Sequence, residues 1–122
     1  MSRVLLIEDN DMNLELIKYL VEAAGHECMT AVDGIQGIEL AQSDPPDLIL
    51  LDIQLPKMDG YAVIKKLRQI EKLKMVPVIA VSSYAMVGDK DMAMTAGFNG
   101  YISKPINPMT FVKEVLELGK VS

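Results

Sequence analysis

The stretch Asp47-Leu48-Ile49-Leu50-Leu51-Asp52 encloses four consecutive apolar residues between two aspartates. A short uninterrupted apolar run is typical of a strand that is buried on both faces, as in the interior of a parallel sheet. We therefore predict a central strand over Leu48–Asp52. Its last residue, Asp52, would be a partly desolvated carboxylate, and such a group needs a partner.

Two further apolar runs also end in charged residues. Glu8 and Asp9 follow the first run of the chain, and Lys104 follows the last one, directly before Pro105. In an open parallel sheet, the carboxyl ends of the strands share one crevice, where ligands bind. Taken alone, the acidic pair has a plainer interpretation as a helix cap, and Lys104 as an ordinary surface lysine. The sequence leaves open whether the Lys104–Pro105 bond is cis.

Strand and helix patterns alternate along the whole chain. The predicted strands are Arg3–Glu8, Glu27–Ala31, Leu48–Asp52, Pro77–Ser82 and Gly100–Ser103. The predicted helices are Asp11–Ala24, Asp33–Gln42, Asp59–Ile70, Tyr84–Ala96 and Pro108–Leu118. This alternation indicates an α/β fold, a doubly wound five-stranded parallel sheet made of five βα units with right-handed crossovers.

Several residues are expected to mark helix ends. Asp11 and Asp59 are the predicted N-caps of their helices, and Gly25 follows the first helix as a C′ glycine. Pro108 suits the first turn of the last helix, where its missing N–H costs nothing.

The composition excludes several classes of protein. The net charge is −5 without a basic patch, which argues against a nucleic-acid binder. No apolar run approaches the roughly 20 residues that a membrane-spanning helix needs, and the N-terminus does not resemble a signal peptide. The single Cys28 suits a reducing cytoplasm and is expected to be a core residue, whereas His26 is expected at the surface.

The charged residues at the strand ends favour a particular chemistry. Glu8, Asp9 and Asp52 would repel one another, and a hard divalent cation such as Mg²⁺ relieves that repulsion with oxygen ligands. The ammonium group of Lys104 could bind a phosphoryl oxygen. Ser82 ends the fourth strand and could donate to the same phosphoryl group, or it could cap the next helix, a role for which Ser83 competes. No histidine accompanies either serine, so a nucleophilic serine is not expected.

Taken together, these motifs resemble the receiver domain of two-component response regulators. The pattern is an acidic pair after the first strand, Asp after the third, Ser or Thr after the fourth and Lys-Pro after the fifth. The resemblance covers residues 3–119 and implies a CheY-like, flavodoxin-like sheet with strand order 2-1-3-4-5. It also implies one receiver domain over residues 1–122 without an effector domain, of the stand-alone type that includes cell-division regulators.

The resemblance implies a role for each residue that would act on a phosphoryl group. Asp52 corresponds to the aspartate that accepts it from a histidine kinase or a histidine phosphotransfer protein. Lys104 and Ser82 correspond to the side chains that contact it once it is bound. Ser82 stands where Thr is frequent, and both occur in the family.

The resemblance also implies a metal site. Asp9, Asp52 and the backbone carbonyl of Gln54 would bind Mg²⁺, for which Mn²⁺ is the expected substitute. Glu8 would act through water, and it stands where Asp is also common.

A switch would pass the signal on. Ser82 would move toward the phosphoryl group and vacate space that Tyr101 fills. The surface of the helix 84–96, the strand 100–103 and the helix 108–118 would change as a result. Its candidate contact residues are Tyr84, Met86, Met92, Met94, Tyr101 and Pro105. Ordinary helix packing is the plainer interpretation of the methionines.

The expected protein is a cytoplasmic monomer that neither binds nucleic acid nor inserts into a membrane, with a kinase or phosphatase as a candidate downstream partner. It would not be an enzyme beyond Mg²⁺-dependent self-phosphorylation and autodephosphorylation. Two alternatives stay open. A Mg²⁺-dependent phosphatase with Asp52 as nucleophile would need an aspartate where this chain has Gln54. A binding module that works without phosphorylation is less expected because the motif set is intact.

Overall fold

The computed structural model describes residues 2–83 and 88–119 of the chain. Its strands are β1 (Arg3–Ile7), β2 (Glu27–Ala31), β3 (Leu48–Asp52), β4 (Val78–Ser82) and β5 (Gly100–Ser103). Its helices are α1 (Asp11–Ala23), α2 (Gly34–Ser43), α3 (Gly60–Gln69), the short 3₁₀ helix η1 (Glu71–Leu73), α4 (Asp89–Ala96) and α5 (Phe111–Gly119). The predicted strands are confirmed to within one residue at each end.

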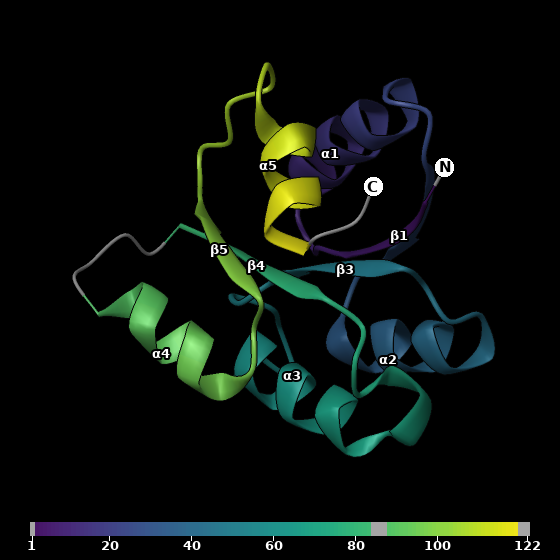
Figure 1. Ribbon diagram of the computed structural model, residues 1–122, viewed down its shortest axis with the longest axis vertical. Helices are drawn as coiled ribbons and strands as arrows, with labels where there is room; N and C mark the ends of the chain where they lie inside the picture. Colours follow the sequence, from purple (N-terminus) through teal and green to yellow (C-terminus); the bar gives the residue numbers. More distant parts are fainter. Residues whose placement is uncertain (1, 84–87, 120–122) are drawn as a thin grey trace.

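All five strands pair in parallel, in the order β2-β1-β3-β4-β5. The predicted fold and strand order are therefore confirmed. Helices α1 and α5 cover one face of the sheet, and α2, α3 and α4 cover the other (Figure 1). Every residue of β3 is buried, because this strand lies in the middle of the sheet with helices on both sides. Among the described residues, no helix has the length and apolar character needed to cross a membrane.

Of the four predicted helix-end signals, Asp59 and Gly25 hold, whereas Asp11 and Pro108 do not. The Asp59 side chain caps α3 by accepting from the N–H of Ala62 at 2.9 Å, and Gly25 has the positive φ of 90° expected after α1. The N-cap of α1, however, is Asn10, whose side chain accepts from the N–H of Asn13 at 3.0 Å. The prediction of Asp11 was wrong by one residue, since both side chains can cap and only the backbone decides which one does.

The last two helices begin later than predicted. Helix α5 starts at Phe111, because residues 108–110 form a turn in which the side-chain oxygen of Asn107 accepts from the N–H of Met109 at 3.0 Å. Helix α4 starts at Asp89, and its N-cap is Gly88 rather than Ser82 or Ser83. Residues 84–87 of the predicted helix lie outside the described residues.

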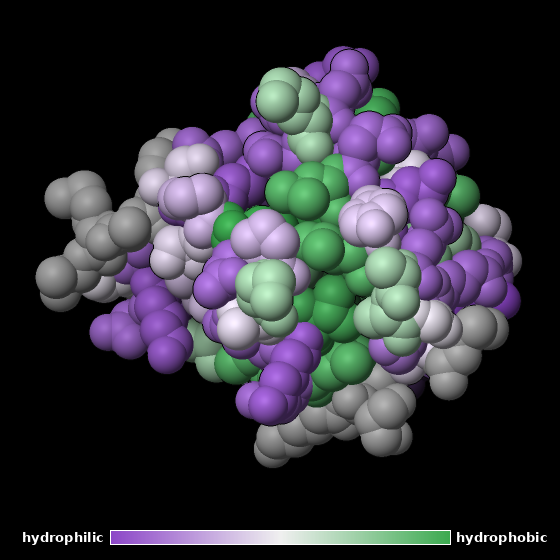
Figure 2. Space-filling view, turned by 90° about the horizontal axis from the view of Figure 1, so that it is seen from above, coloured by the Kyte–Doolittle hydropathy of each residue, from purple (hydrophilic) through white to green (hydrophobic). Residues whose placement is uncertain are grey.

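Exposed apolar side chains lie on α1 and on the turn before α5, where Met109 is exposed, and together they form what we call the apolar surface over α1 and α5. On α1, Met12, Leu16 and Tyr19 are exposed at a spacing of three to four residues, with Met12 at 83%. These side chains face outward, whereas Leu14, Ile17 and Val21 of the same helix fill the core. Figure 2 looks onto this side of the molecule and shows apolar residues gathered between hydrophilic ones. Since scattered exposed apolar residues are common and contiguous ones are not, this face is a candidate contact surface.

Candidate functional site

The three predicted carboxylates meet at the carboxyl end of the sheet. Ile7 of β1 lies beside Leu51 of β3, so the residues that follow each of them are also neighbours. Glu8, Asp9 and Asp52 each bring one carboxylate oxygen within 4.8 Å of the others. Strand pairing therefore brings the three carboxylates together, as the sequence predicted, although Asp52 lies more than 40 positions after Asp9.

The carboxylates differ in their access to water. Glu8 is 1% exposed and Asp52 is 4% exposed, whereas Asp9 is an exposed residue. Glu8 is buried because the chain continues the pairing of β1 past Ile7: its N–H donates to the carbonyl of Ala31 at 3.0 Å. The site thus has two buried carboxylates, Glu8 and Asp52, and one carboxylate, Asp9, that is open to solvent.

Lys104 closes the cluster on the side of β5. Its Nζ donates to Oε1 of Glu8 at 2.8 Å and to Oδ2 of Asp52 at 3.2 Å. Its backbone N–H donates to the carbonyl of Ser82 at 2.7 Å, which fixes the residue beside the end of β4. The bond to Pro105 is cis, one of the two forms that the sequence had left open. The plain interpretation of Lys104 as a surface lysine is wrong.

The loop after β3 orients Asp52. The N–H of Gln54 donates to Oδ1 of Asp52 at 2.9 Å, and the Gln54 side-chain oxygen accepts from the N–H of Ser83 at 3.0 Å. Gln54 was predicted to contribute only its carbonyl to a metal. In the structure its side chain also ties the β3–α3 loop to the end of β4. No pattern in the sequence indicated that contact.

The electrostatics of the site are dominated by burial. Burial raises the pKa of Glu8 to about 7, helped by the adjacent Asp52 and opposed by Lys104. Burial also lowers the pKa of Lys104, but its hydrogen bond with Glu8 and the charge of Asp52 outweigh this and leave that pKa above its ordinary value. One ammonium group is therefore too little for the buried acidic pair.

The same residues fit a hard divalent cation. Oxygen ligands from one or two carboxylates, with waters completing the shell, are what Mg²⁺ prefers. Asp9 is exposed and Asp52 is held in place, while the two buried carboxylates of Glu8 and Asp52 share the single ammonium group of Lys104. The donor set is thus compatible with Mg²⁺ binding.

The predicted switch residues have separate positions. Ser82 is fully buried at the end of β4, next to the strand that carries Asp52, and Tyr101 is half-buried in β5. Pro105 is exposed, as are Met92 and Met94 on α4. Tyr84 and Met86 lie outside the described residues. The movement of Ser82 and Tyr101 stays a prediction.

The two residues with the plainest predicted roles behave nearly as expected. Cys28 is buried in the core beneath α1, and burial raises the pKa of its thiol to about 11, which keeps it protonated and inert. His26 is half-buried near the surface, where its Nδ1 accepts from the N–H of Ser2 at 3.0 Å.

Comparisons with known proteins agree with this geometry. The family model of the response regulator receiver domain matches residues 4–116. The polar-differentiation response regulator DivK of Brucella ovis is 42% identical over 92% of this chain and 91% of its own length. The same protein of Brucella anthropi is 41% identical over the same shares of the two chains.

Solved structures with the same fold include three receivers. A putative response regulator from Chloroflexus aurantiacus has a TM-score of 0.91 and 27% identity, covering 98% of both chains. The chemotaxis protein CheY4 of Vibrio cholerae also has a TM-score of 0.91, with 27% identity over 97% of this chain and 98% of its own. The receiver domain of the sensor histidine kinase PA1611 from Pseudomonas aeruginosa, which holds a magnesium ion in its active site cleft, has a TM-score of 0.88 and 31% identity over 98% of both chains. The protein belongs to the response regulator receiver domain family.

Proposed function

We propose that this protein is the phosphoacceptor of a two-component or phosphorelay system, and that Asp52 accepts the phosphoryl group. The observation that carries the proposal is the position of Asp52. It is a buried carboxylate at the end of β3, oriented through Oδ1 by Gln54 and paired through Oδ2 with Lys104. A carboxylate held in this way is ready for in-line attack, and positioning with charge stabilisation supplies most of the catalysis in phosphoryl transfer.

The transfer would break one bond and form one. A carboxylate oxygen of Asp52 attacks the phosphorus of a phosphohistidine, the P–N bond breaks, and the imidazole leaves and takes up a proton. Lys104 stabilises the negative charge on the phosphoryl oxygens, and Ser82 donates to one of them. The product is an acyl phosphate on Asp52, which adds nearly two negative charges to the site.

A Mg²⁺ ion bound by Asp9, Asp52 and the carbonyl of Gln54, with Glu8 behind them, would supply additional positive charge for the phosphoryl group. The buried Glu8 and Lys104 would hold the site in shape around it. Besides this transfer from phosphohistidine, self-phosphorylation from small donors and autodephosphorylation are the only reactions that we attribute to the protein.

The donor would be a histidine kinase or a histidine phosphotransfer protein that contacts the apolar surface over α1 and α5. This surface adjoins the site: α1 begins two residues after Asp9, and Met109 lies five residues after Lys104. Met12, Leu16 and Met109 are exposed there, and apolar side chains around a reactive centre suit a partner that excludes water during transfer.

The signal would leave through the surface of α4, β5 and α5. A hollow of about 390 Å³ on this side is lined by Lys90, Tyr101, Glu114, Glu117 and Leu118. The names of the DivK relatives refer to polar differentiation, and we infer a related role in the cell cycle, with a kinase or phosphatase as the regulated partner. We infer a cytoplasmic monomer, which the single buried thiol of Cys28 suits.

The test of the phosphoacceptor is the Asp52→Asn variant. Wild-type protein incubated with Mg²⁺ and acetyl phosphate should gain the mass of one phosphoryl group in intact mass spectrometry, and the variant should gain none. Asp91→Asn removes an exposed carboxylate from α4 and should be modified like the wild type. If the wild type gains no mass, or if Asp52→Asn gains it equally, Asp52 is not the acceptor. The first of these outcomes favours a binding module that works without phosphorylation.

The test of the donor surface is the pair Met12→Lys and Met75→Lys. Both residues are methionines that are more than 80% exposed, at 83% and 88%, but only Met12 lies on the α1–α5 surface. We expect Met12→Lys to slow transfer from a phosphorylated donor protein about tenfold, the effect of losing one apolar contact in an interface. Transfer from acetyl phosphate should be unchanged in both variants. Equal slowing by both variants would show that added charge, rather than this surface, is responsible.

A further inference from the structure

Helix α4 is held weakly along its length and at its N-terminal end. Within α4, only Ala93 is fully buried, and Met92 and Met94 are exposed. The helix starts after Gly88, which has a positive φ of 99° and provides no side-chain cap. A helix of eight residues with one buried side chain gains little from packing, so its position depends on the few contacts that it makes.

The C-terminal end of α4 is held by a side chain from α3. The guanidinium of Arg68 donates from Nε and Nη2 to the carbonyl of Gly97 at 3.2 and 2.9 Å. Nη2 also donates to Oδ1 of Asn99 at 2.8 Å, and Nη1 donates to the carbonyl of Val76 at 2.7 Å. One rigid planar fork thus connects the last turn of α3 with the segments that precede β4 and follow α4. Several charged hydrogen bonds from one group make this attachment strong.

Two more residues on the same face of α3 support this attachment. Tyr61, Ile64 and Arg68 are spaced three and four residues apart, so they project from one side of the helix. The Tyr61 ring meets the buried ring of Phe98 edge to face, with 6.2 Å between the ring centres. A Cβ placed on Gly97 would lie 3.5 Å from Cγ of Arg68, so the backbone of Gly97 packs closely against α3.

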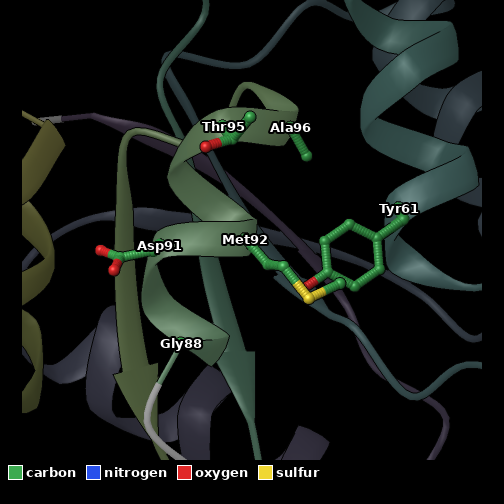
Figure 3. Close-up of a pocket in the computed structure, with 6 residues that line it drawn as sticks. All are labelled: Tyr61, Gly88, Asp91, Met92, Thr95 and Ala96. Atoms are coloured by element: carbon green, nitrogen blue, oxygen red, sulfur yellow. The ribbon is translucent and has the colours of Figure 1, made fainter.

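The remaining contact between α3 and α4 is of a different kind. A groove between the two helices, with a volume of about 420 Å³, is lined by Tyr61, Gly88, Asp91, Met92, Thr95 and Ala96. Figure 3 shows the Met92 side chain reaching from α4 toward the Tyr61 ring, while Asp91 points away from it. A methionine has several rotatable bonds and can keep such a contact while the helix turns. The groove runs along the length of α4, from Gly88 to Ala96, and Met92 is its flexible contact with Tyr61 near the N-terminal end.

We propose that Arg68 fixes the C-terminal end of α4 and makes Gly97 the pivot about which α4 turns when the Asp52 site is phosphorylated. The inference rests on the proposed function, since it concerns how that site is read. Gly97 is the C-cap of α4 and has a positive φ of 115°, so the chain changes direction at this residue. With one end fixed, displacement grows toward Gly88. Lys90, beside Tyr101 in the hollow on the α4–β5–α5 surface, would move, and Ala96 would stay in place.

Amide NMR on the full chain tests the proposal. Hydrogen exchange in the wild type should be at least about tenfold slower at Phe98, whose N–H donates to the carbonyl of Ala93, than at Met92, whose N–H donates to the carbonyl of Gly88. Addition of Mg²⁺ and beryllofluoride should shift the amides of residues 89–92 several times more than those of residues 95–97. Equal exchange at both ends of α4, or equal shifts along it, would contradict the pivot. The wild-type protein alone is sufficient for this test.

Variants of Arg68 test its part. Arg68→Lys keeps the positive charge but loses the planar guanidinium group. Arg68→Met keeps only the apolar part of the side chain. Both should raise exchange at Phe98 toward the rate at Met92 and spread the beryllofluoride shifts over all of α4. Lys66→Met removes an exposed positive charge from the same helix and should change neither. If either Arg68 variant folds and behaves like the wild type, Arg68 is not the anchor.

The experiment separates this inference from the proposed function. Shifts at Asp9, Asp52 and Gln54 upon addition of Mg²⁺ and beryllofluoride report binding at the site itself. Their absence would contradict the phosphoacceptor, whereas their presence together with a uniform response of α4 would contradict the pivot alone.

Discussion

Replacement of Lys104 by Met should destabilise the protein by about 3–5 kcal/mol at pH 8, the cost of removing one partner of a buried ion pair. Met has nearly the volume of the lysine stem, so the loss is electrostatic. Glu8 and Asp52 would both remain buried, without the ammonium that now lies 2.8 and 3.2 Å from them. Urea unfolding followed by circular dichroism gives the free energy, since the chain has no tryptophan for fluorescence.

The loss should depend on pH and on Glu8. At pH 5 Glu8 can take up a proton, which removes its buried charge, so the variant should lose less stability there than at pH 8. The double variant Glu8→Gln with Lys104→Met should recover much of the loss at pH 8 for the same reason. Lys113→Met, which removes an exposed lysine from α5, should stay within about 0.5 kcal/mol of the wild type. A Lys104→Met variant as stable as the wild type at pH 8 would show that the ion pairs contribute nothing.

The sheet and the position of the site could be predicted from the sequence because both depend on strong local signals. Apolar runs such as Leu48–Leu51 are continuous, and the charged residue after each run marks the strand end. Since parallel strands present those ends at one edge, Asp52 and Lys104 meet whatever the lengths of the helices between them. Their order in the sheet came from the family resemblance.

What could not be predicted depends on contacts between distant segments. The bonds of Arg68 to Gly97 and Asn99 join residues about 30 positions apart, and an arginine in the last turn of a helix resembles any surface arginine. The periodicity of α1 showed a helix but not which side Met12 and Leu16 would face, because apolar residues lie on both sides. The burial of Glu8 depends on how far β1 stays paired with β2.

The pH dependence of the resting protein should come largely from Glu8. Its pKa is about 7 in the folded protein and about 4.5 when it is exposed to water, so folding favours the protonated form. The cost of burying the charged form is absent below pH 4.5 and increases as the pH rises from 4.5 to 7. Above pH 7 it reaches about 3 kcal/mol, at 1.36 kcal/mol for each pKa unit.

Glu8→Gln removes this titration and keeps the shape of the side chain. The stability of the variant relative to the wild type should therefore rise by about 3 kcal/mol between pH 4 and pH 8, measured by urea unfolding at each pH. Glu15→Gln, on the exposed side of α1, should show no comparable trend. Saturating Mg²⁺ should reduce the difference, because a cation beside the carboxylates stabilises the charged form of Glu8 as well. A difference that does not change with pH would mean that the pKa of Glu8 is the same in the folded and unfolded protein, and that Lys104 offsets the burial of Glu8.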